Sequence, residues 1–139
     1  MKSRVQVGAF VLVASAMAIA NWHSVQADEE YVTKARAQTL IQEPLAGVEG
    51  KEVIIKHFSI PPEFVGGKHV HPASVYVYVL EGELTIESEG ETLTFKAGEI
   101  YPEPMHRSMV GKNLSSTDDL ELLIFQIGDE GKPMMVKAE

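Results

Sequence analysis

The stretch that decides the fold is Gly67-Lys68-His69-Val70-His71-Pro72, followed by Val75-Tyr76-Val77-Tyr78-Val79-Leu80-Glu81-Gly82-Glu83. The second part is an unbroken run of β-branched and aromatic residues, which favours an extended strand that ends at Gly82. Side chains two positions apart on a strand point to the same face. We therefore expect His69 and His71 to converge on one small object, with Val70 turned the other way. Neutral imidazole is the commonest metal ligand, so the pattern predicts a metal ion between the two rings.

The flanking sequence extends this β-pattern over most of the chain. From Glu52 the apolar residues recur with a period of two until Pro61-Pro62, and Gly82 and Gly90 mark hairpin turns. Residues 31–50 are mixed, and a short helix or strand around residues 39–41 stays open. Many short strands with close turns predict an all-β sandwich or barrel. Strands are predicted over 52–60, 69–71, 75–80, 84–87, 92–95, 100–101, 105–110 and 120–127, with a polar loop over 111–119.

The first 27 residues have the layout of a secretory signal peptide. Lys2 and Arg4 precede an almost wholly apolar run over residues 5–20, and Val25-Gln26-Ala27 offers small residues for cleavage. The alternative is a membrane anchor, but the apolar run is short for a spanning helix. We expect cleavage after Ala27, a single domain over residues 28–139, and a periplasmic or secreted product that is not membrane-bound.

The charge and the cysteine count exclude several functions. The chain carries a net charge of −8, and loss of Lys2 and Arg4 with the signal peptide would take it to −10. Nucleic acids and anionic membranes both favour basic patches, so neither is an expected partner. The chain has no cysteine, which removes disulfides and thiolate chemistry.

The histidine pair and its strand resemble the small single-domain cupins, whose fold is a jelly-roll barrel, also called a double-stranded β-helix. The first cupin motif has two histidines separated by one residue and a glycine that closes the hairpin, and His69, His71 and Gly82 match it. The resemblance spans about residues 52–127. It implies a small-molecule substrate or ligand in the barrel and a possible homodimer.

The second cupin motif contributes the third expected ligand. This motif begins with a glycine and ends with a proline, a histidine and an asparagine, as do Gly98, Pro104, His106 and Asn113. Here it lacks the usual glycine between the proline and the histidine, and its asparagine lies farther along. The metal ligands that the resemblance implies are His69, His71 and His106.

One departure from the family pattern changes the expected chemistry. The glutamate ligand of the first motif falls at Val75, which cannot bind a metal. Three neutral imidazoles leave a divalent cation its full charge, so the centre would attract an anionic co-ligand. The resemblance then implies a dioxygenase-type oxidoreductase that acts on a small organic anion. The metal is a divalent transition metal, with Fe, Cu, Mn, Ni and Zn all open.

Two other functions stay open. Val75 also fits a barrel whose metal site has been lost and which binds a small organic ligand without metal. A sugar isomerase or epimerase would use a histidine to move protons, but the sequence offers no obvious second acid.

Several further residues have two interpretations each. His57 is either a pocket residue or a hydrogen-bonded core histidine, and we favour the core. Glu103 and Glu63 could point inward as acids, although solvent-exposed loop carboxylates are the commoner case. We expect Tyr76 and Tyr78 to face away from the barrel interior. Met105 and Met109 either line the pocket or fill gaps in the core.

Overall fold

The computed structural model describes residues 34–138, and every regular element in this range is a β-strand. The predicted signal peptide over residues 1–27 lies outside the described residues. The strands are β1 (Arg36–Pro44), β2 (Lys51–Ile60), β3 (Phe64–Val65), β4 (His69–Val70), β5 (Ser74–Glu81), β6 (Glu83–Ser88), β7 (Glu91–Lys96), β8 (Ile100–Glu103), β9 (Val110–Asn113), β10 (Leu120–Asp129) and β11 (Val136–Lys137). The all-β prediction is confirmed.

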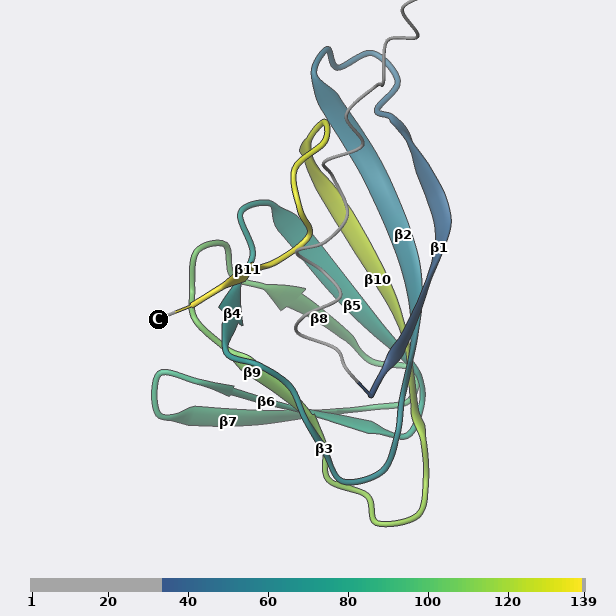
Figure 1. The fold of residues 1–139 in the computed structure, drawn as a ribbon, viewed down its shortest axis with the longest axis vertical. Coiled ribbons are helices and arrows are strands. Elements are labelled where there is room, and N and C mark those ends of the chain that lie inside the picture. The colour runs from purple at the N-terminus through teal and green to yellow at the C-terminus, as the bar shows by residue number, and fades with distance from the viewer. Residues whose placement is uncertain (1–33, 139) are drawn as a thin grey trace, which may run out of the picture.

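The strands form two opposed antiparallel sheets and a short closing pair. The larger sheet has the order β1-β2-β10-β5-β8, and the smaller one has the order β3-β9-β6-β7. Figure 1 shows the sheets meeting at one end and diverging at the other, with β4 and β11 paired between them. This is the predicted jelly-roll arrangement.

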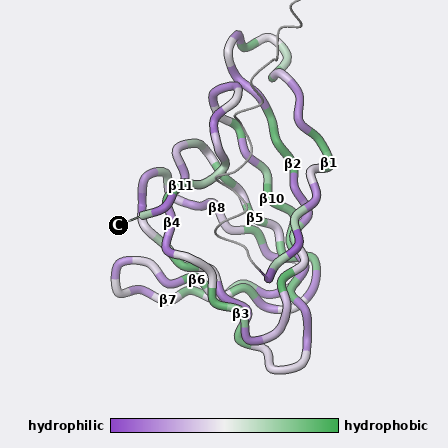
Figure 2. Tube along the Cα trace, viewed as in Figure 1, coloured by the Kyte–Doolittle hydropathy of each residue, from purple (hydrophilic) through white to green (hydrophobic). Residues whose placement is uncertain are grey.

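The hydrophobic core follows from the alternation of inward and outward side chains along each strand. Val75, Val77 and Val79 on β5 are buried, and they pack against Leu122 and Ile124 on β10. Figure 2 shows hydrophobic residues recurring along β2, β5 and β10. Burying each such side chain contributes about 1.5–3 kcal/mol, so this layer supplies much of the driving force for folding.

The outward face of β5 also agrees with the sequence. Tyr76 is exposed and Tyr78 is half-buried, while their valine neighbours point inward. The alternation that predicted both tyrosines to face away from the interior is confirmed.

Several strand boundaries differ from the sequence prediction. Strands β3 and β11 are additional, β8 and β10 are longer than predicted, and β9 extends to Asn113, within the polar loop predicted over 111–119. Around residues 39–41, where the sequence allows either a short helix or a strand, the structure has strand β1, whose nine residues are all exposed. The strand predicted over 105–110 is wrong: residues 105–106 form a turn in which His106 has φ of 59°, and β9 begins only at Val110. A single left-handed residue breaks the extended backbone, and periodicity alone does not reveal it.

The asparagine of the second motif has a structural role. Asn113 is buried, and its side-chain amide donates to the backbone oxygens of Ile60, Pro61 and Asp118 at 3.1, 3.1 and 2.9 Å. Its side-chain oxygen accepts from the Ser115 backbone N–H at 3.1 Å. These bonds fasten the loop that leads into β10 to the end of β2.

Candidate functional site

His69 and His71 lie at one end of the barrel interior, as the sequence predicts. The backbone N–H groups of His69 and Met109 each donate to the other residue's carbonyl at 2.9 Å, and β4 also pairs with β11. His71 follows directly after β4 and is only 1% exposed. The extended backbone therefore turns both rings to the same side.

The backbone contacts of the two rings orient their other nitrogens toward each other. His69 Nδ1–H donates to the Gly67 carbonyl at 2.9 Å, and His71 Nδ1–H donates to the Met134 carbonyl at 2.7 Å. A carbonyl can only accept, so both Nδ1 atoms carry hydrogen. The two Nε2 atoms then lie 3.1 Å apart, with the ring planes at 89°. A backbone acceptor on the far nitrogen is the usual support of a metal-binding histidine.

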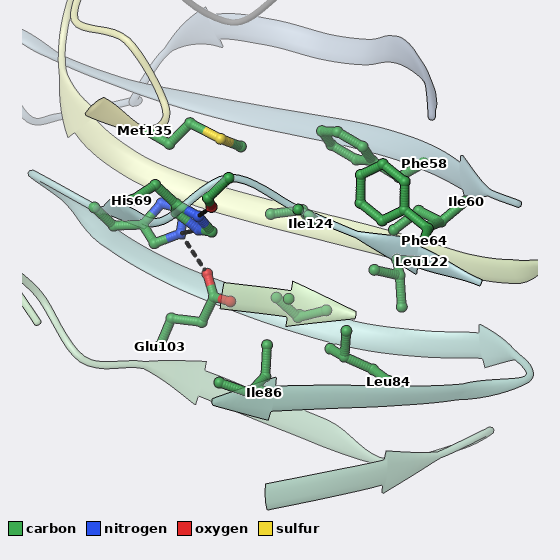
Figure 3. A pocket seen from close by; sticks show the side chains of 15 residues that line it. Phe58, Ile60, Phe64, His69, Leu84, Ile86, Glu103, Leu122, Ile124 and Met135 are labelled. Atoms are coloured by element: carbon green, nitrogen blue, oxygen red, sulfur yellow. Dashed lines mark hydrogen bonds and ion pairs between the residues drawn. The ribbon is translucent and has the colours of Figure 1, made fainter. Parts of the chain in front are cut away.

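A buried carboxylate completes the cluster. Glu103 on β8 is 8% exposed, and its Oε2 lies 2.8 Å from His71 Nε2 (Figure 3). The contact has ion-pair distance, but Oε2 receives no directed hydrogen bond among residues 34–138. Two imidazole nitrogens and a carboxylate oxygen are all electron-pair donors. The cluster therefore needs either an added proton or a metal ion between these atoms.

Burial favours the neutral form of the first histidine. Desolvation lowers the pKa of His69 below its ordinary value, and the neighbouring His71 adds to this, while the Gly67 carbonyl and Glu103 oppose it. A neutral His69 at neutral pH keeps the Nε2 lone pair that a metal ligand needs.

The cluster forms the polar end of an apolar cavity of ≈ 80 Å³. This volume has room for several water molecules or a small organic molecule. Figure 3 shows the aromatic and aliphatic side chains at the end away from the histidines. The lining residues are Phe58, Ile60, Phe64, Gly66, Gly67, His69, His71, Val77, Leu84, Ile86, Glu103, Gly111, Leu122, Ile124 and Met135.

The structure does not bring His106 to the other two histidines. Its side chain is exposed and does not line the cavity, while its backbone N–H donates to the His71 carbonyl at 3.0 Å. The carboxylate of Glu103, three residues earlier, lies against His71 instead. Of the two interpretations of Glu103, the inward one is found and the exposed one is wrong.

The position of Glu103 accounts for the valine at the usual glutamate position. Val75 on β5 and Glu103 on β8 are direct partners in the antiparallel register, and both point inward. The carboxylate that the first motif lacks is thus supplied by the neighbouring strand. The strand predicted over 100–101 ends before Glu103, whereas β8 extends to Glu103, which lies two residues after Tyr101 and shares its inward face. The spacing of these two residues therefore indicates an inward Glu103 only once the longer strand is known.

The other residues that the sequence offered as pocket candidates do not line the cavity. His57 is neither a pocket residue nor a buried core residue: it is half-buried, and its Nε2 lies 2.7 Å from Glu121 Oε2. Glu63 is exposed, and so is Met105, whereas Met109 is buried in the core. Neither methionine lines the cavity.

The histidine and glutamate contacts run as a chain from His69 through His71 to Glu103. Within residues 34–138, no three His, Cys, Asp or Glu side chains form a ready-made metal cluster. The two separations nevertheless suit neighbouring ligands: two atoms about 2.1 Å from one ion, at right angles, are about 3.0 Å apart. The chemistry of the donor set, two imidazole nitrogens and one carboxylate oxygen, therefore fits a divalent metal.

The fold and the site together define a cupin barrel, and the family comparison agrees. The sequence model of the Cupin_2 family, described as a cupin domain, matches residues 56–125. The chain belongs to the cupin family. A comparison with curated protein sequences finds no match.

Solved structures with the same fold come from diverse proteins. A cupin 2 domain-containing protein from Halorhodospira halophila has a TM-score of 0.62 and 18% identity, over 78% of this chain and 72% of that one. The DMSP lyase DddQ from Ruegeria pomeroyi has a TM-score of 0.63 and 17% identity, over 78% and 54%. KdgF from Halomonas sp. has a TM-score of 0.54 and 20% identity, over 66% and 77%. At these identities the likeness establishes the fold alone.

No helix within residues 34–138 is long and apolar enough to cross a membrane.

Proposed function

We propose that His69, His71 and Glu103 bind one divalent transition metal at the polar end of the barrel cavity. The observation that carries this proposal is the convergence of two Nε2 atoms and a carboxylate oxygen, at 3.1 and 2.8 Å. Glu103 takes the place that the sequence prediction assigned to His106. When bound, such a metal supplies Lewis acidity and open coordination positions.

We further propose a metal-dependent oxidoreductase of the dioxygenase type, acting on a small organic anion. One carboxylate leaves a divalent ion with one net positive charge, which favours a monoanionic co-ligand. The apolar walls, including Phe58, Phe64 and Leu122, exclude water and hold the apolar part of the substrate.

Metal analysis of the purified protein and its variants tests the site. We expect about one metal ion per chain in the wild type and loss of that ion in His71→Ala and Glu103→Gln. His106→Ala is the matched control and should keep the metal, because its side chain is exposed. Stoichiometric metal that survives His71→Ala, or that is lost in His106→Ala, would contradict the proposed ligand set.

The alternative is a metal-free cupin that binds a small organic ligand. The arrangement of the three side chains supports this alternative, because His71 lies between His69 and Glu103. A proton on His71 would satisfy Glu103 without any metal. Saturable ligand binding in the presence of a strong chelator would support this function. Metal-dependent and O₂-dependent turnover would exclude it.

A further inference from the structure

The C-terminal segment, residues 130–138, lies across the end of the cavity that holds the histidines. The Gly131 N–H donates to Glu52 Oε1 at 2.9 Å, and the Ala138 N–H donates to the Lys68 carbonyl at 3.1 Å. Between these two points β11 pairs with β4, so that Lys137 lies opposite His69. The segment is therefore anchored on both sides of its two methionines.

The two adjacent methionines of this segment have different surroundings. Met134 belongs to the hydrophobic core, and its carbonyl accepts the His71 hydrogen bond. Met135 is outside that core cluster and lines the cavity. Figure 3 shows the Met135 side chain extending over the cavity on the side of His69. Met134 thus fills a gap in the core, whereas the Met135 thioether faces the same cavity as the imidazoles.

We infer that the Met135 thioether is a third donor that, together with His69 and His71, makes this site selective for reduced copper, Cu(I). The inference rests on the proposed function, because the same histidine pair binds the metal. Copper is one of the candidate transition metals, Cu(I) is its reduced state, and in that state the soft Met135 thioether replaces the hard Glu103 carboxylate as the third donor. Thioether sulfur is a soft ligand, and soft ligands select Cu(I) over harder cations. A methionine side chain has three rotatable bonds, so it can adjust to an ion beside His69 without movement of the anchored backbone.

The charge of the cavity favours the same ion. Glu103 is the one carboxyl group among the cavity-lining residues of the described chain, so the lining supplies at most one negative charge. The imidazoles and the thioether are neutral ligands. A monovalent cation therefore brings the site to neutrality, whereas a divalent cation leaves a net charge among apolar walls, which is costly unless a further anion enters.

Two affinities, measured in parallel, test the inference on the purified protein without oxygen. The first is for Cu(I), in competition with a chromophoric Cu(I) chelator, and the second is for Zn²⁺. We expect Met135→Leu to weaken Cu(I) binding roughly 10–100-fold, as for loss of other supporting groups around a metal, and to leave Zn²⁺ binding unchanged. Met105→Leu is the matched control, since Met105 is an exposed methionine that does not line the cavity. It should leave both affinities unchanged.

X-ray absorption of the wild-type protein with one equivalent of Cu(I) should show sulfur in the first coordination shell. No sulfur there overturns the inference even if Met135→Leu does not fold. If both ions bind and Met135→Leu changes neither affinity, or if Met105→Leu weakens Cu(I) binding as much, the role of Met135 is refuted while the proposed metal site stands. If the wild type binds neither Cu(I) nor Zn²⁺, the proposed metal function itself fails.

Discussion

Glu103 and Val75 face each other across β5 and β8, and this pair decides which side chain completes the site. Both residues are buried and both point inward. Because the two residues are paired, a carboxylate at either position would enter the barrel interior at nearly the same level along the strands. The barrel can therefore supply its acid from β8 while β5 keeps an apolar side chain in the core.

A carboxylate exchange between these two positions tests this interpretation. We expect Val75→Glu alone to lower the free energy of unfolding by about 3–5 kcal/mol, because it places an uncompensated charge opposite Glu103 in the core. The double variant Val75→Glu/Glu103→Val should recover part of that loss and retain metal, since it transfers the single carboxylate from β8 to the paired position on β5. Urea unfolding and metal analysis measure the two effects. A double variant no more stable than Val75→Glu would argue against the exchange.

Burial of His69 predicts how the metal-free protein responds to pH. The folded pKa of His69 lies below its ordinary value of 6.5, chiefly through desolvation. Between the folded pKa and 6.5 the unfolded chain binds more protons, so the free energy of unfolding rises with pH in this window. The contribution of neutral, buried His69 to the free energy of unfolding is fully present above pH 6.5 and is lost as the pH falls through the folded pKa of His69.

We therefore expect His69→Gln to flatten the pH dependence of stability below pH 6.5. The measurement is urea unfolding in the presence of a chelator, on both sides of that pH. An equally steep loss of stability in His69→Gln would show that another group is responsible.

At the scale of elements, the hairpin between β5 and β6 determines how the two sheets connect. Gly82 has φ of 80°, and a Cβ atom there would lie 2.9 Å from the Asp119 carbonyl oxygen. Gly90, between β6 and β7, has φ of 84° but nothing within 4 Å of such an atom. The first turn is therefore restricted by both its backbone and its neighbours, and the second by its backbone alone.

These two glycines give a matched pair of variants. Gly90→Ala should cost about 1–2 kcal/mol, because an L-residue is unfavourable at this φ. Gly82→Ala should cost about 1–3 kcal/mol more, because the added methyl group also meets the Asp119 backbone. Urea unfolding of both variants measures the difference. Equal losses would mean that the loop before β10 moves aside freely.

At the scale of the whole molecule, the outer face of the large sheet carries exposed apolar side chains. Tyr76 on β5, Ile100 on β8 and Ile127 on β10 all point outward, as their registers require. An exposed apolar sheet face is typical of an interface between proteins. A second copy of this chain is the partner that the sequence prediction named.

We expect the protein to be a homodimer in solution and Ile100→Glu to shift it toward monomers. Ile100 is 57% exposed on the large sheet, and Val65, which is 61% exposed on the small sheet, provides the matched control Val65→Glu. Light scattering after size-exclusion chromatography measures the mass. A wild type that stays monomeric at all concentrations, or equal effects of both variants, would refute this interface.

The strand pattern and the histidine pair could be predicted from the sequence because both depend on the period of two. That period placed Val75, Val77 and Val79 inward, Tyr76 outward and the two imidazoles on one side. The turn at His106 could not be predicted in this way, because one residue with positive φ leaves no periodic signal.

The amino-acid order by itself determined an all-β fold and a convergent His69–His71 pair, since the alternation of residues along each strand decides both features, and the resemblance to the cupin motifs added the barrel. Only the tertiary structure decided that Glu103 joins the pair, that His106 stays outside it and that Met135 lines the cavity. These three outcomes depend on cross-strand register and on the path of the C-terminal segment. Register and path are set by packing between residues far apart in the chain, and local spacing carries no record of them.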